Sequence, residues 1–86
     1  MNDLLNVRIV TPKAIVHEGQ AMSVSSINSK GNFDILPRHA NIITIIEHSP
    51  IIVRTDKKER LKFDFPIAII LNIKNKVNIY TDITLK

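Results

Sequence analysis

Residues 5–10 read Leu-Asn-Val-Arg-Ile-Val, and their apolar side chains recur at every second position. Leu5, Val7 and Ile9 therefore share one face of an extended chain, while Asn6 and Arg8 share the other. Residues 61–66 and 76–81 alternate in the same way. Strands with one apolar and one polar face are typical of antiparallel sheets that cover a core on one side. Because helical periodicity is nearly absent, these stretches predict an all-β fold.

Turn-forming residues recur at short intervals, for example at 11–13, 18–19, 29–32, 55–58 and 74–75. Short strands separated by such turns predict a small antiparallel β-sandwich of about nine to ten short strands, or a small barrel. The run 42–47 also permits a helical turn, but its β-branched residues favour a strand. Pro66 is expected at a strand start, an edge or a bulge, because it cannot donate to a ladder. The expected strands are 4–10, 14–17, 21–28, 33–36, 42–47, 51–55, 59–65, 68–73 and 76–81.

Length and composition limit the classes of protein that fit. The chain has 86 residues and is expected to form one β-sandwich domain spanning 1–86. It contains no Cys, which excludes disulfides and thiolate metal sites. Its longest apolar run, 67–71, is far shorter than the ~20 residues of a membrane-spanning helix. No secretory signal is expected from its first residues, and the formal charge of +4 allows an anionic partner without requiring one.

The titratable residues show no catalytic or metal-binding pattern. His17, His39 and His48 lack the close spacing of zinc-ligand motifs, and two glycines are too few for a phosphate-binding loop. Asp34 and Asp64 are better explained as solvated carboxylates than as an acid–base pair. We therefore predict no catalytic, metal-binding or nucleotide-binding residues and no cofactor.

The chain has one basic cluster, formed by Lys57, Lys58, Arg60 and Lys62. Together with aromatic residues, such a cluster would suit a small nucleic-acid-binding β-barrel. The nearby Phe63 and Phe65, however, occupy the apolar phase of their strand. Core packing and a solvated hairpin tip are therefore the favoured interpretation, and nucleic-acid binding is the alternative.

Segment 29–40, Ser-Lys-Gly-Asn-Phe-Asp-Ile-Leu-Pro-Arg-His-Ala, places turn signals on both sides of a short apolar strand. It predicts either a tight corner of the sheet or a rigid loop that presents side chains to a partner.

Three segments, in order along the chain, resemble one known family. VRIVTPKAIVHEGQAMSVS (7–25) is similar to its opening strands, GNFDILPRHANIITII (31–46) to its hallmark GEFGILPGHAPLITAL, and LNIKNKVNIYTD (71–82) to its LEVRDNKVTVLAD. By these motifs the chain resembles the N-terminal β-sandwich domain of the epsilon subunit of F-type ATP synthases. The most specific part is Ile35-Leu36-Pro37 followed by His39-Ala40.

The resemblance has departures, chiefly at glycines. Arg38 stands where the family has a glycine between the hallmark Pro and His, Asp34 replaces the glycine before Ile-Leu-Pro, and a later glycine pair falls near Ala68-Ile69. Asn32 replaces an acidic residue. Because glycine reaches positive φ most easily, either these backbone positions have relaxed or the fold carries strain.

The resemblance implies a non-catalytic subunit of the central stalk in a proton-translocating F-type ATP synthase. The family's sandwich is clamped to the gamma subunit and rests on the c-ring, so that ring rotation reaches the catalytic head. It implies no cofactor, no direct small-molecule ligand, and a place peripheral to the membrane on the cytoplasmic face of a bacterial inner membrane. Many relatives carry a C-terminal helical domain, which is expected to be absent here because the sequence ends at Lys86.

Two groups of residues match the family's rotor-facing positions. The expected c-ring contact loop comprises Ser29, Lys30, Gly31, Asn32 and Phe33, and the expected rotor-interface corner comprises Pro37, Arg38 and His39. Plain turn and corner residues are the alternative interpretation. An orphan β-sandwich interaction domain with a new partner, or a basic nucleic-acid-binding barrel, stay open as other functions.

Overall fold

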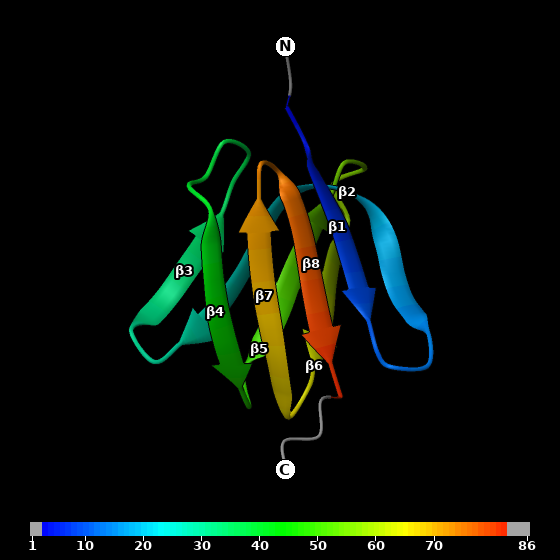
Figure 1. Cartoon of the computed structure of the whole chain (residues 1–86). Coiled ribbons are helices and arrows are strands. Elements are labelled where there is room, and N and C mark those ends of the chain that lie inside the picture. Colours follow the sequence, from blue (N-terminus) through cyan, green and yellow to red (C-terminus); the bar gives the residue numbers. More distant parts are fainter. Residues whose placement is uncertain (1–2, 83–86) are drawn as a thin grey trace.

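The computed structural model describes residues 3–82, which form eight strands and, within that range, no helix (Figure 1). The predicted all-β fold is therefore confirmed. The strands are β1 (Leu5–Val10), β2 (Ile15–Asn28), β3 (Gly31–Ile35), β4 (Ile42–Glu47), β5 (Pro50–Thr55), β6 (Arg60–Asp64), β7 (Ile67–Ile73) and β8 (Lys76–Thr81).

All eight strands belong to one sheet that curls over itself into a β-sandwich. The order is β4-β7-β8-β1-β2-β5-β6, with β3 paired to β2 away from this path. β2 approaches β4 although the two are not neighbours in the ladder, because the curled sheet brings its distant parts face to face. β1 and β8 pair in parallel, and the other paired strands are antiparallel. The parallel pair brings the first and last strands together.

The turn expected at Glu18-Gly19 was wrong. The two strands expected at 14–17 and 21–28 are parts of the single strand β2, which spans Ile15–Asn28, so the nine expected strands become eight. Gly19 lies opposite Val7 in the β1–β2 ladder, so the backbone stays paired through the predicted turn. The irregularities in β2 lie on either side of Gly19: the register with β1 shifts at Val16, and the register with β5 shifts between Ala21 and Ser23. The later bulge bends the strand between the part of β2 that pairs with β1 and the part that pairs with β3.

The core lies between the two layers and consists of the alternate apolar residues that the sequence predicted. In β1, Leu5, Val7 and Ile9 are buried while Asn6 and Arg8 are exposed. The run 42–47 is a strand, as favoured, and Pro66 directly precedes β7. The buried hydrophobic residues are Leu5, Val7, Ile9, Ala21, Val24, Ile35, Ile46, Ile51, Val53, Ala68, Ile70, Val77 and Ile79.

Candidate functional site

The β2–β3 tip, residues 29–33, is a tight hairpin turn held to the opposite layer. Ser29 and Lys30 form the turn, and Asn28 pairs with Gly31 across it. The φ of Gly31 is +115°, a conformation that favours glycine. The Asn28 side chain accepts a hydrogen bond from the Lys30 N–H at 2.9 Å and donates one to Thr44 Oγ1 at 3.0 Å. The tip is therefore anchored to β4 through one asparagine.

The side chains of the tip divide into an exposed set and one that packs on the core. Ser29, Lys30 and Asn32 are exposed, while Phe33 is half-buried against the core. Lys30 carries the one formal charge among residues 29–33. The tip thus presents a cation and short polar groups on a stiff support.

The Pro37 corner, residues 36–41, begins with a reverse turn. His39 N–H donates to Leu36 O at 3.0 Å, which places Pro37 and Arg38 at its two central positions. The φ of Arg38 is +69°, which with proline before it fits a type II turn. The family has glycine at this position, so Arg38 adopts a backbone conformation that is strained for a residue with a side chain. Asp34 has no positive φ, so that position has relaxed.

Hydrogen bonds attach the Pro37 corner to the turn between β7 and β8. Arg38 N–H donates to Asn75 Oδ1 at 2.7 Å, and Lys74 N–H donates to Asn41 Oδ1 at 3.0 Å. The buried Asn72 side chain lies within 3.5 Å of His39 O and 3.4 Å of Ala40 O and donates to both. The corner is therefore fixed by asparagine side chains rather than by a ladder.

One further contact of the corner involves the N-terminal segment. The Arg38 guanidinium pairs with the Asp3 carboxylate, and the Arg38 side chain remains 78% exposed. An ion pair this exposed contributes little to stability. The charge of Arg38 is thus available to a partner.

The tip and the corner do not form one surface. They lie at opposite ends of β3 (Figure 1), separated by a strand of five residues. At about 3.4 Å per residue this separation is of the order of 15 Å. The two predicted contact groups are therefore separate features.

Sequence reasoning had not located a third feature, the apolar face. This surface covers the outer side of β4, β7 and β8, and comprises Ile43, Ile45, Ile69, Leu71, Ile73 and Tyr80. Ile43 is 69% exposed and Ile45 is 55% exposed. The sequence did contain an indication of this face. In runs 42–46 and 67–71 nearly every residue is apolar, Thr44 being the exception, so both faces of these strands carry apolar side chains and one of those faces lies outside the core.

The basic side chains of the cluster and the aromatic side chains point to opposite faces of segment 60–65, outward and toward the core. Arg60 and Lys62 are exposed, while Phe63 and Phe65 stack on each other at 6.3 Å and pack against the core. Bases need an exposed aromatic face to stack on. This arrangement does not favour the nucleic-acid alternative.

Within residues 3–82, no three His, Asp or Glu side chains gather in a way that could hold a metal ion. Over the same range, no helix has the length and apolar character needed to cross a membrane.

Comparison with known proteins identifies the family. The family model for the ATP synthase delta/epsilon chain β-sandwich domain matches residues 4–85. The chain belongs to this family. The resemblance noted in the sequence, and the β-sandwich it implied, are thereby confirmed.

Curated relatives within the family are ATP synthase epsilon chains. One from Campylobacter jejuni is 38% identical over 47 residues, which cover 55% of this chain and 36% of that protein. One from Sulfurimonas denitrificans is 32% identical over 54 residues, covering 63% and 42%. The chain thus matches less than half the length of these relatives.

Solved structures share the fold at low sequence identity. A chain of the Euglena gracilis mitochondrial ATP synthase superposes with a TM-score of 0.83 at 10% identity, covering 95% of this chain and 52% of that one. A chain from the Tetrahymena thermophila mitochondrial ATP synthase, in a structure of its central stalk and c-ring, gives 0.74 at 13% identity and covers 93% and 64%. At these identities the likeness concerns the fold alone.

Proposed function

We propose that this chain is a non-catalytic subunit of the central stalk of a proton-translocating F-type ATP synthase. In this role it couples rotation of the c-ring to the gamma subunit and the catalytic head. It would lie peripheral to the membrane, on the cytoplasmic face of a bacterial inner membrane. Family membership and the epsilon-chain relatives support the placement.

The observation that carries the proposal is the apolar face on β4, β7 and β8. Ile45 lies opposite Ile69, and Ile69 lies opposite Tyr80, so that apolar side chains run across three adjacent strands. Contiguous exposed apolar surface marks an interaction site. We assign this face to the gamma subunit, because a permanent interface is more apolar than a transient one.

The c-ring would meet the polar features instead. Lys30 and Asn32 on the β2–β3 tip are proposed to contact the polar loops of the ring. Arg38 and His39 at the Pro37 corner are proposed to make a second rotor contact. Because hydrogen bonds hold the tip to β4 and the corner to the β7–β8 turn, both can transmit force without rearranging.

The test is co-expression of this chain with its cognate gamma subunit, followed by size-exclusion chromatography. A one-to-one complex is expected, and Ile69→Glu should abolish it by placing a carboxylate in the apolar face. Lys62→Glu is the matched control, since it adds the same carboxylate on the outer face of the opposite layer. No complex with the unsubstituted chain, or equal loss with both variants, would refute the assignment.

A further inference from the structure

The free edge of β4 differs from the other strand edges. Within residues 3–82, β3, β4 and β6 each pair with a single neighbour. β6 carries Arg60, Lys62 and Asp64, and the short β3 carries Asn32 and Asp34. Charged and short edges of this kind discourage pairing with another chain.

β4 has weaker protection than β3 and β6. Its sequence is Ile-Ile-Thr-Ile-Ile-Glu, without proline and with one charge at its end. Ile43 and Ile45 are among the most exposed hydrophobic side chains of the described residues. An apolar, unblocked edge strand is a template for a further strand.

The backbone groups on this free edge follow from the register with β7. His48 N–H donates to Pro66 O at 3.0 Å, which continues the pairing of Glu47 with Ile67 by one residue. In an antiparallel ladder the hydrogen-bonded residues alternate. The backbone groups of Ile42, Thr44 and Ile46 therefore form the hydrogen bonds to β7.

The intervening residues, Ile43, Ile45 and Glu47, consequently direct their N–H and C=O groups away from β7. Of these groups, Glu47 O accepts a hydrogen bond from Ser49 Oγ at 3.2 Å. The N–H groups of all three and the carbonyls of the two isoleucines are open to a new partner.

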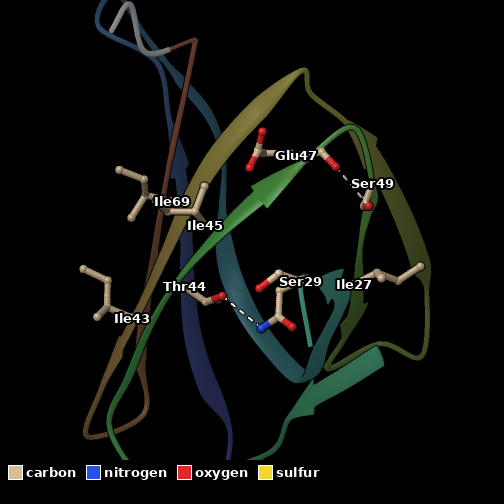
Figure 2. Close-up of a pocket in the computed structure, with 9 residues that line it drawn as sticks. Ile27, Ser29, Ile43, Thr44, Ile45, Glu47, Ser49 and Ile69 are labelled. Carbon is tan, nitrogen blue, oxygen red and sulfur yellow. Dashed lines mark hydrogen bonds between the residues drawn. The ribbon is translucent and has the colours of Figure 1, made fainter. Parts of the chain in front are cut away.

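A groove runs beside this edge and has room for side chains. It encloses about 700 Å³ between β4 and the end of β2, and its lining includes Ile27, Ser29 and Thr44. Ile43, Ile45 and Ile69 also line this groove, where it opens onto the apolar face. In Figure 2, Thr44 points toward the end of β2, while Ile43 and Ile69 project from the other side of their strands. A strand laid along β4 would place alternate side chains in the groove and on the apolar face.

We propose that the free edge of β4 binds an extended segment of a partner polypeptide as an added antiparallel strand. The segment carries aliphatic side chains opposite Ile43 and Ile45, and Lys or Arg opposite Glu47. Small polar side chains opposite Thr44 face the groove. Main-chain hydrogen bonds supply affinity in this mode, and alternate side chains supply specificity.

A second copy of this chain fits the edge less well. Pairing two β4 strands across a two-fold axis centred on Ile45 would place Ile43 beside Glu47 of the partner subunit. The contact would be confined to one strand from each copy, smaller than the ~1,200 Å² of stable interfaces. A separate segment can instead continue over the apolar face. The assignment holds whichever protein supplies it.

The test uses a synthetic peptide, acetyl-Lys-Thr-Val-Thr-Ile-Thr-amide with a fluorescent label, and fluorescence anisotropy. In antiparallel register its Lys lies opposite Glu47, its Val opposite Ile45 and its Ile opposite Ile43. N-methylation of the peptide's Val and Ile removes the N–H groups that face β4 and should weaken binding at least about tenfold. N-methylation of its second and third Thr, whose N–H groups face away, is the matched control and should leave binding within about twofold.

A protein variant provides an independent check. Ile45→Pro removes the N–H group that points away from β7 and leaves the β4–β7 hydrogen bonds intact. Edge strands tolerate proline at such a position. The proline variant should lose peptide binding, whereas Ile45→Val should keep it, with the fold of both verified by circular dichroism. Failure of the unmodified peptide to bind, or equal binding by the two methylated peptides, would overturn the proposal. Sedimentation equilibrium showing a dimer that Ile45→Pro dissociates would overturn the choice of occupant.

Discussion

Replacement of Arg38 tests the geometry of the Pro37 corner. Its φ of +69° costs an L-residue about 1–2 kcal/mol relative to glycine. Arg38→Gly would relieve this cost. It would also lose the exposed pair with Asp3, worth about 0.2–1 kcal/mol, and raise the entropy of the unfolded chain by about 0.5–1 kcal/mol. These effects nearly cancel, so the glycine variant should match the unsubstituted chain.

Arg38→Ala separates the contributions. Alanine loses the same ion pair but keeps the positive-φ cost, so it should be less stable than glycine by about 0.5–1 kcal/mol. Asp3→Asn serves as the control, because it removes the pair and leaves the turn unchanged.

Urea denaturation followed by circular dichroism measures these differences as midpoint shifts at a common slope. The expected order of stability is glycine equal to arginine, with alanine below both. An alanine variant as stable as the glycine variant would show that position 38 does not need the left-handed conformation, and would refute the type II turn.

Substitutions at four further positions test other parts of the structure. Gly31→Ala should destabilise the chain by about 1–2 kcal/mol because of its positive φ alone, since a Cβ there meets open space. Gly19→Ala, inside β2, should instead stabilise the chain by about 0.5 kcal/mol. Thermal denaturation of the two variants compares these effects. Asn72→Asp should lower the free energy of unfolding by at least about 3 kcal/mol, because it buries a carboxylate beside two carbonyl oxygens. Equal stability of Asn72→Asp and Asn72→Leu in urea denaturation would contradict this. His17→Phe should raise stability by about 1 kcal/mol, because it removes a buried, unpaired ring nitrogen next to Phe63; a lower melting temperature would reveal an unseen hydrogen-bond partner.

Much of the fold was accessible from the sequence because the strands obey a simple alternation. In β1 and β8, burial follows the apolar phase residue by residue, and the predicted ends lie within one residue of those observed. The same reasoning failed at Gly19, because a glycine inside a paired strand is indistinguishable in sequence from a glycine in a turn. The parallel pairing of β1 with β8 depends on contacts between the chain ends, which local patterns do not encode.

The candidate site was less predictable for a related reason. The tip and the corner were found as sequence segments, but their separation depends on the direction of β3. The supports of the corner, Asn72 and Asn75, follow more than 30 residues after it and look like ordinary strand and turn residues in sequence. The apolar face was hidden because alternation shows which residues share a side, but not which strands lie together.

The most direct test of the stalk assignment is protection of single cysteines in the complex with gamma. The chain contains no native Cys, so Ile43→Cys on the apolar face and Lys62→Cys on the opposite face each give one reactive thiol. We predict that bound gamma slows maleimide modification at position 43 by at least about tenfold, because an interface core excludes solvent, and leaves position 62 unchanged. Protection at position 62 with an unchanged rate at position 43 would contradict the account.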